Sequence, residues 1–226
     1  MADDHGHGDA HGHGHHPALA HHFFDMQQQH EACKLGLWLF LVTEILLFGG
    51  LFCFYAIYRA WYPEMFTGAN EMLDWRLGAL NTLVLIASSV TVALAIRYIQ
   101  LNRKGLSAVY LLATILFAGA FLVVKYFEYS HKFHLGLLPG KFFSCTDPEL
   151  LTVANPHIFF GAYFAMTGLH GLHVLGGMAF LSWVLWRVMQ GAYGSTYYTP
   201  VELGGLYWHL VDLIWIYLFP LLYLIG

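Results

Sequence analysis

The hydrophobic residues of this chain fall into five long blocks that are separated by polar segments. The blocks lie between Lys34 and Arg59, from Leu77 to Ile96, after Lys104, between Glu149 and Arg187, and from Pro200 onward. Each block is close to the ~20 residues that an α-helix needs to cross a bilayer. The pattern therefore predicts an all-α fold, a polytopic membrane bundle of five transmembrane helices, within residues 31–226.

Composition supports a membrane protein and excludes several other classes. The chain is 58% hydrophobic and 11% charged, whereas an average soluble domain has roughly 25% charged residues. With ten Lys and Arg residues and a net charge of −4, it has no basic surface for nucleic acid. Cys33, Cys53 and Cys145 form no Cys-x-x-Cys pair, which argues against a disulfide scaffold, a thiolate zinc site or a redox motif.

The first 30 residues differ from the rest and are rich in Gly, Ala, Asp and His. They show no basic leader followed by an apolar run, so we predict neither a signal peptide nor a transit peptide. Such a segment buries too little apolar surface to offset its chain entropy, so residues 1–30 are predicted to be disordered. Histidine-rich tracts take up Cu²⁺, Ni²⁺ or Zn²⁺. We expect only adventitious metal at His5, His7, His11, His13, His15 and His16.

Basic residues near the ends of the blocks predict an orientation. One side collects Lys34, Arg97, Arg103, Lys104 and Arg187, and the other collects Arg59, Arg76, Lys132 and Lys141. The positive-inside rule favours a cytoplasmic N terminus, because three of the five lie in the short 97–104 loop. Five spans then place the C terminus in the periplasm, with the chain in a bacterial cytoplasmic membrane.

Two helix starts are also predicted. Asn155-Pro156 and Thr199-Pro200 each place a capping side chain before a proline at the first helical position. Glu202 lies three residues after Thr199, which is the spacing of a capping box.

Glu44 is the one formal charge inside the first block. It lies about 15 Å along a helix from Lys34, near the middle of the hydrocarbon. Removal from water favours the neutral form of a carboxyl group. The residues alone leave two interpretations open, a proton-exchanging carboxyl and a structural hydrogen-bond donor. If Glu44 faces the bundle interior, a histidine of the fourth span is its expected partner.

Further polar residues lie in the other spans. In the fourth span His170 and His173 are three residues apart, and in the fifth span His209 and Asp212 repeat this spacing. Metal or haem binding is one interpretation, but an interhelical polar network is favoured, because the surrounding aromatic and polar residues can satisfy structural histidines. Glu128, at the end of the third span, is interpreted as an interfacial group whose side chain reaches water.

Small and amide residues suggest helix contacts. Gly168 and Gly171 would let another helix approach the fourth span, and Asn81 suits contact from the second span. No catalytic residue is predicted in the chain.

Five stretches of sequence resemble successive helices of one family, subunit III of the haem-copper cytochrome c oxidases. They are residues 37–44 (LWLFLVTE), 80–82 (LNT), 127–129 (FEY), 167–174 (TGLHGLHV) and 207–212 (YWHLVD). The resemblance covers about residues 27–226 and follows the family's order. Glu44 matches the intramembrane glutamate of that family.

The resemblance implies a non-catalytic core subunit of a respiratory complex in aerobic electron transport. Such a subunit supports proton uptake and active-site integrity in subunit I. Subunits I and II, the implied partners, hold the haem and copper, and this chain holds no redox cofactor. Bound phospholipid is a further expectation, and membership of a larger respiratory supercomplex is left open. Many family members have seven helices, and this chain resembles them from their third helix onward.

Other functions remain open from the sequence. A subunit of a quinol oxidase and an accessory protein of nitric oxide reductase resemble the same family. An independent proton or ion transporter built around Glu44 and the histidines is a different class, although the sequence shows no repeated half and no paired broken helices. A free-standing haem protein would need axial ligands from two helices, such as His170 and His209.

Overall fold

The computed structural model describes residues 23–70, 72–138, 144 and 155–225. The histidines from His5 to His16, with Lys141 and Cys145, lie outside these residues. The helices are α1 (Met26–Trp61), α2 (Pro63–Asn70), α3 (Trp75–Gln100), α4 (Lys104–His134), α6 (Pro156–Met189) and α7 (Thr199–Phe219), and a π-helical turn (Pro220–Leu224) extends α7. No strand occurs among the described residues.

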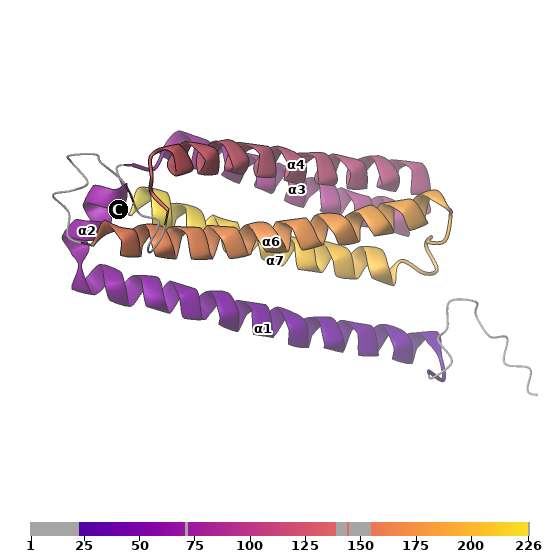
Figure 1. The fold of residues 1–226 in the computed structure, drawn as a ribbon. Helices are drawn as coiled ribbons and strands as arrows, with labels where there is room; N and C mark the ends of the chain where they lie inside the picture. The colour runs from indigo at the N-terminus through magenta and orange to yellow at the C-terminus, as the bar shows by residue number, and fades with distance from the viewer. Residues whose placement is uncertain (1–22, 71, 139–143, 145–154, 226) are drawn as a thin grey trace, which may run out of the picture.

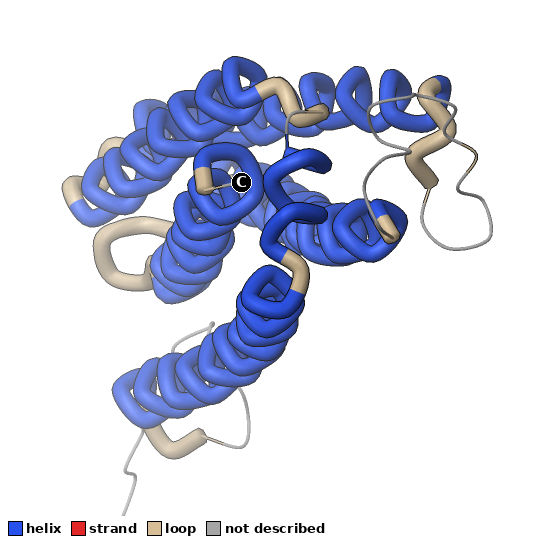
Figure 2. Tube along the Cα trace, turned by 90° about the vertical axis from the view of Figure 1, so that its left-hand side faces the viewer, coloured by secondary structure: helices blue, strands red, loops and turns tan. Residues whose placement is uncertain are grey.

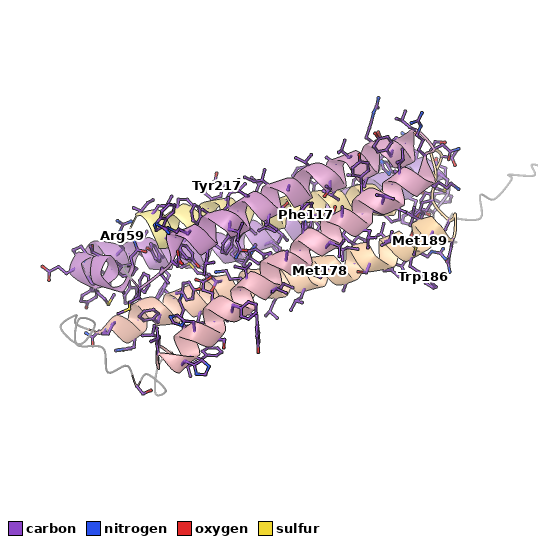
Figure 3. All side chains as sticks on the ribbon, turned by 90° about the horizontal axis from the view of Figure 1, so that it is seen from above. Arg59, Phe117, Met178, Trp186, Met189 and Tyr217 are labelled. Carbon is purple, nitrogen blue, oxygen red and sulfur yellow. The ribbon has the colours of Figure 1, made fainter. Side chains whose placement is uncertain are left out.

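Five helices, α1, α3, α4, α6 and α7 with its π turn, are long and apolar enough to cross a membrane. The predicted all-α membrane bundle is therefore confirmed. Successive spans run in opposite directions (Figure 1). Arg59 lies at one end of the bundle, and Trp186 and Met189 lie at the other (Figure 3). The short helix α2, at the Arg59 end, was not predicted.

Four of the spans form a closed ring, which we call the four-helix core. In it α3 packs on α4, α4 on α6, α6 on α7, and α7 on α3. The buried residues of α4 recur at alternating intervals of four and three: Ser107, Leu111, Thr114, Ala118, Phe121, Lys125, Glu128 and Lys132. This is the spacing of a knobs-into-holes seam. In lipid, small residues and interhelical hydrogen bonds hold such seams together, and Ser107 Oγ donates one to the carbonyl of Ala95 at 2.9 Å.

Close helix approach depends on other glycines than the predicted ones. A Cβ atom at Gly177 would lie 2.8 Å from the ring of Trp208, so α6 and α7 touch there. At Gly168 the nearest atom of another helix would be the Tyr129 hydroxyl at 3.8 Å, and at Gly171 no atom of another described helix lies within 4 Å. Of the two predicted glycines, Gly168 therefore lies in van der Waals contact with α4, and Gly171 contacts no neighbouring helix among the described residues.

Helix α1 packs on the outside of the core, against α6, α7 and α2. It stands apart from the other spans when the bundle is viewed from its end (Figure 2). Its buried residues are Gln29, Leu41, Phe48 and Tyr55, and the last three recur every seventh residue. At the Arg59 end, Phe66 of α2 lies edge-on between the rings of Tyr55 and Phe159. This narrow contact leaves much of α1 exposed.

The helix starts differ from the predictions. Helix α1 begins at Met26, with Asp25 accepting a hydrogen bond from the Gln28 amide, so residues 26–30 are helical. Asn155 precedes α6 as predicted, but it adopts a left-handed conformation (φ 58°) and its side chain makes no capping bond.

The predicted capping box at α7 is wrong, because both of its side chains contact α1. Thr199 Oγ1 shares a 2.9 Å hydrogen bond with His30 Nδ1, and Glu202 pairs with Lys34 Nζ at 3.1 Å. These contacts attach the start of α1 to the start of α7.

Candidate functional site

Glu44 of α1 and His173 of α6 form the contact that joins α1 to the core in mid-span. Glu44 Oε2 lies 2.7 Å from His173 Nε2, and the two side chains are 12% and 15% exposed. The predicted partnership of Glu44 with a histidine of the fourth span is confirmed. The edge of Phe48 packs on the imidazole, with ring centroids 5.3 Å apart. The Tyr207 hydroxyl donates a hydrogen bond to the His173 carbonyl at 3.0 Å.

The second ring nitrogen determines how many protons this pair holds. His173 Nδ1 lies 2.8 Å from the carbonyl oxygen of Leu169, and a carbonyl can only accept, so Nδ1 carries a hydrogen. One further proton then lies between Glu44 and Nε2. It resides either on a neutral carboxyl that donates to a neutral imidazole or on an imidazolium that donates to a carboxylate. The pair can therefore hold one proton, on either partner, without changing its geometry.

Glu128 lies at the centre of a second, fully enclosed group, which we call the Glu128 cluster. Its carboxylate contacts Lys125 Nζ at 2.8 Å and Lys132 Nζ at 3.2 Å. The hydroxyls of Tyr163 and Tyr223 donate to its Oε1 at 2.8 and 2.6 Å. Only 4% of Glu128 is exposed, so the interpretation as an interfacial group that reaches water is wrong.

Four side chains around Glu128 were not predicted as partners. Lys125 and Lys132 lie three residues before and four residues after it on α4, a spacing that places all three on one helix face. From this spacing the sequence could have predicted both lysines as partners of Glu128. Tyr163 comes from α6 and Tyr223 from the π turn, and nothing in the local sequence indicates those contacts.

Asp212 and His209 face different surroundings, although they lie three residues apart on α7. Asp212 is buried, and the Ser88 hydroxyl lies 3.4 Å from its Oδ2, while Trp208 Nε1 donates to Ser88 Oγ at 3.0 Å. His209 is partly exposed, and its Nδ1 shares a 2.7 Å hydrogen bond with Ser89 Oγ. Both contacts cross the seam between α3 and α7.

His170 and Asn81 do not join any of these groups. His170 is fully buried between Phe121 and Trp215, with ring centroids 5.5 and 5.3 Å away. Neither its ring nitrogens nor the side-chain amide atoms of Asn81 have a hydrogen-bond partner among the described residues. The six residues predicted to form an intramembrane polar network therefore divide among the Glu44–His173 pair, the Glu128 cluster, the contacts of Asp212 and of His209 with α3, and the isolated His170.

Among the described residues, no three or more His, Cys, Asp or Glu side chains gather where they could bind a metal ion. The chemistry available at Glu44–His173 is proton exchange and hydrogen bonding. The Glu128 cluster instead holds fixed charges in place.

Comparisons with known proteins agree with this geometry. A family model described as cytochrome c oxidase subunit III matches residues 19–226. The chain is 36% identical over 195 residues to cytochrome c oxidase subunit 3 of Synechocystis sp., covering 84% of this chain and 74% of the relative. It is 33% identical to the Thermostichus vulcanus protein of the same name, covering 84% and 86%. It is 28% identical to cytochrome bo(3) ubiquinol oxidase subunit 3 of Pseudomonas putida, covering 85% of each.

Five apolar spans make this a multi-pass membrane protein, and the family match places it in the class of respiratory oxidase subunits. The chain belongs to the cytochrome c oxidase subunit III family. Association with the other oxidase subunits and a place in respiratory electron transport follow from that membership.

Proposed function

We propose that this chain is the non-catalytic subunit III of a bacterial cytochrome c oxidase, in which subunits I and II hold the haem and copper. The observation that carries the proposal is the family match over residues 19–226, which includes all five spans. Cytochrome c as electron donor is supported by the higher identity to two cytochrome c oxidase subunits, 36% and 33%, than to the ubiquinol oxidase subunit, 28%.

Within that complex, the chain supports proton uptake and the integrity of the active site in subunit I. The Glu44–His173 pair is suited to this role because it holds one exchangeable proton between two spans. Apolar grooves on both sides of α1, one of them lined by Phe48, Phe52, Leu210 and Tyr217 among others, suit acyl chains of membrane lipid.

Purification in mild detergent tests the function. The tail up to residue 22 is removed first, because its histidines can scavenge metal. We expect the chain to co-purify with haem- and copper-containing subunits, and the complex to consume oxygen with reduced cytochrome c. Oxygen consumption with a quinol alone would instead support a quinol oxidase, the second candidate. A haem spectrum from the isolated chain, or purification without any other oxidase subunit, would contradict the proposal.

We also propose that the chain lies in the cytoplasmic membrane with its N terminus in the cytoplasm. Bacterial relatives and the basic residues near the α3–α4 loop support this placement. Cysteine labelling checks it, in a variant without the native cysteines. We expect Gln100→Cys, at the end of α3, to react only from the cytoplasmic side and Thr67→Cys, in α2, only from the periplasmic side. Both positions are exposed, and the reverse pattern would invert the orientation.

A further inference from the structure

His209 places a polar group on the outer surface of the bundle at mid-membrane depth. It lies near the middle of the span Thr199–Leu224, and its partner Ser89 lies near the middle of the span Trp75–Gln100. Both side chains are only partly buried. Polar side chains at this depth normally face the bundle interior or a partner, because lipid offers no hydrogen bond.

The hydrogen bond to Ser89 satisfies only one of the two ring nitrogens. Nδ1 of His209 takes part in it, and no hydrogen bond to Nε2 occurs within the part of the chain that the structure describes. The surrounding outward-facing side chains are apolar. Ile86 and Val90 are 44% and 55% exposed. We call this surface, with Ser89 and His209, the α3/α7 face.

Two outward-facing hydroxyl groups in other spans are already satisfied by the backbone of their own helices. The hydroxyl of Ser182 on α6 donates to the Met178 carbonyl at 2.7 Å, and that of Thr43 on α1 donates to the Phe40 carbonyl at 2.6 Å. The outer face of α4 presents apolar side chains, among them Val109, Leu112, Leu116 and Val123. Those surfaces suit lipid as they are, whereas the α3/α7 face does not.

We propose that the α3/α7 face docks a transmembrane helix of another oxidase subunit, which presents a hydrogen-bonding side chain opposite His209. The inference rests on the proposed function, which supplies the partner subunits. Small side chains at Ser89 and Ala93 leave room for a helix to approach, and the apolar side chains around them supply packing. An acyl chain would fill the same space but would leave Nε2 without a partner.

Photo-crosslinking in the assembled complex tests the location of the contact. A benzophenone amino acid replaces Val90 on the α3/α7 face or, as a matched control, Val123 on α4, since both valines are 55% exposed. We expect a covalent product with another oxidase subunit from position 90 at several times the yield from position 123. Equal yields, phospholipid adducts alone at position 90, or no product there in a complex that retains all its subunits would overturn the inference.

Substitutions test the role of the second ring nitrogen. His209→Ala removes the group offered to the partner, whereas His209→Asn retains a hydrogen-bonding amide. Because a single interhelical hydrogen bond in a membrane is weak, we expect about three-fold weaker retention of the chain in the complex for His209→Ala. Retention of the chain in the His209→Asn variant should be close to that of the unaltered chain. Ser182→Ala should leave retention unchanged.

Ser89→Ala separates docking from internal packing. It removes the same hydrogen bond within the chain but leaves His209 available to the partner. A loss of retention equal to that of His209→Ala would show that only the internal bond matters, and the docking role would be wrong. If the unaltered chain purifies without other oxidase subunits, the proposed function fails instead, and the two failures are therefore distinguishable.

Discussion

Glu44 and Glu128 are both intramembrane glutamates, but they have opposite surroundings. Glu44 lies on the peripheral helix α1 and has one side-chain partner, His173. Glu128 lies in the four-helix core, where two lysines and two tyrosines from three elements surround it. Glu44 shares one proton with its single partner. The partners of Glu128 fix it as an anion, because two buried ammonium groups need its charge.

Their positions in the fold explain this difference. Glu128 sits on the regular seam of α4, so every neighbouring residue is set by the packing of the core. Helix α1 touches the core along a narrow stripe and is not part of the ring of four helices. We therefore interpret the Glu128 cluster as a structural anchor and the Glu44–His173 pair as the proton-sharing joint between α1 and the core.

The largest effect is expected from Glu128→Ala. This change leaves Lys125 and Lys132 buried without their carboxylate, and breaking a buried ion pair costs roughly 3–5 kcal/mol. We expect little folded chain in the membrane and a lower unfolding temperature for any that remains, measured by thermal unfolding in detergent. The control is Glu64→Ala on α2, whose exposed carboxylate should matter little. Near-normal stability of Glu128→Ala would show that the cluster is not an anchor.

An intermediate effect is expected at Glu44. Glu44→Gln can still donate a hydrogen bond to His173 Nε2, so the initial oxygen consumption of the complex should stay close to wild type. Glu44→Ala opens a cavity and leaves a partly buried ring nitrogen unpaired, which costs about 1–3 kcal/mol. Its effect should therefore appear as weaker retention of the chain or as faster loss of activity during turnover.

Oxygen consumption followed to inactivation, beside subunit content on a gel, distinguishes these outcomes. A hydrophobic carbodiimide, which reacts with a protonated carboxyl in an apolar setting, should modify Glu44 when the shared proton is on its carboxyl and should spare Glu128. Immediate loss of activity in Glu44→Gln with all subunits present would mean that this residue serves the oxidase reaction directly. Equal modification of both glutamates would remove the distinction between joint and anchor.

The sequence predicted the spans well because each is a long apolar run, but it could not predict side-chain surroundings. His170 and His173 lie on one face by spacing, about 60° apart around the helix. That angle is enough for His170 to face the core and for His173 to face α1. Glu128 lies near the end of its span, where access to water is the usual expectation. Its burial depends on Tyr223, which is 95 residues away.

Short helices, and side chains whose partners are distant in sequence, were still harder to predict from the sequence. Helix α2 has eight residues, too few for a hydrophobic pattern to show. The capping box failed because Thr199 and Glu202 contact residues of α1 that are distant in sequence. A local pattern cannot indicate that a tertiary contact competes for the same side chains.

The smallest effect is expected from Lys34→Met, which breaks the ion pair with Glu202 where α1 begins. The two side chains are 38% and 24% exposed, so water and salt screen their attraction, and such pairs contribute ~0.5 kcal/mol or less. Subunit retention should therefore change little, and any change should vanish at high salt. Glu202→Gln provides the matched control, because it removes the same pair from the α7 side.

Comparison of Lys34→Met with Glu44→Ala shows where α1 is attached to the core. A larger loss in Lys34→Met than in Glu44→Ala would place the main attachment at the end of the helix, and Glu44–His173 would then no longer be the joint.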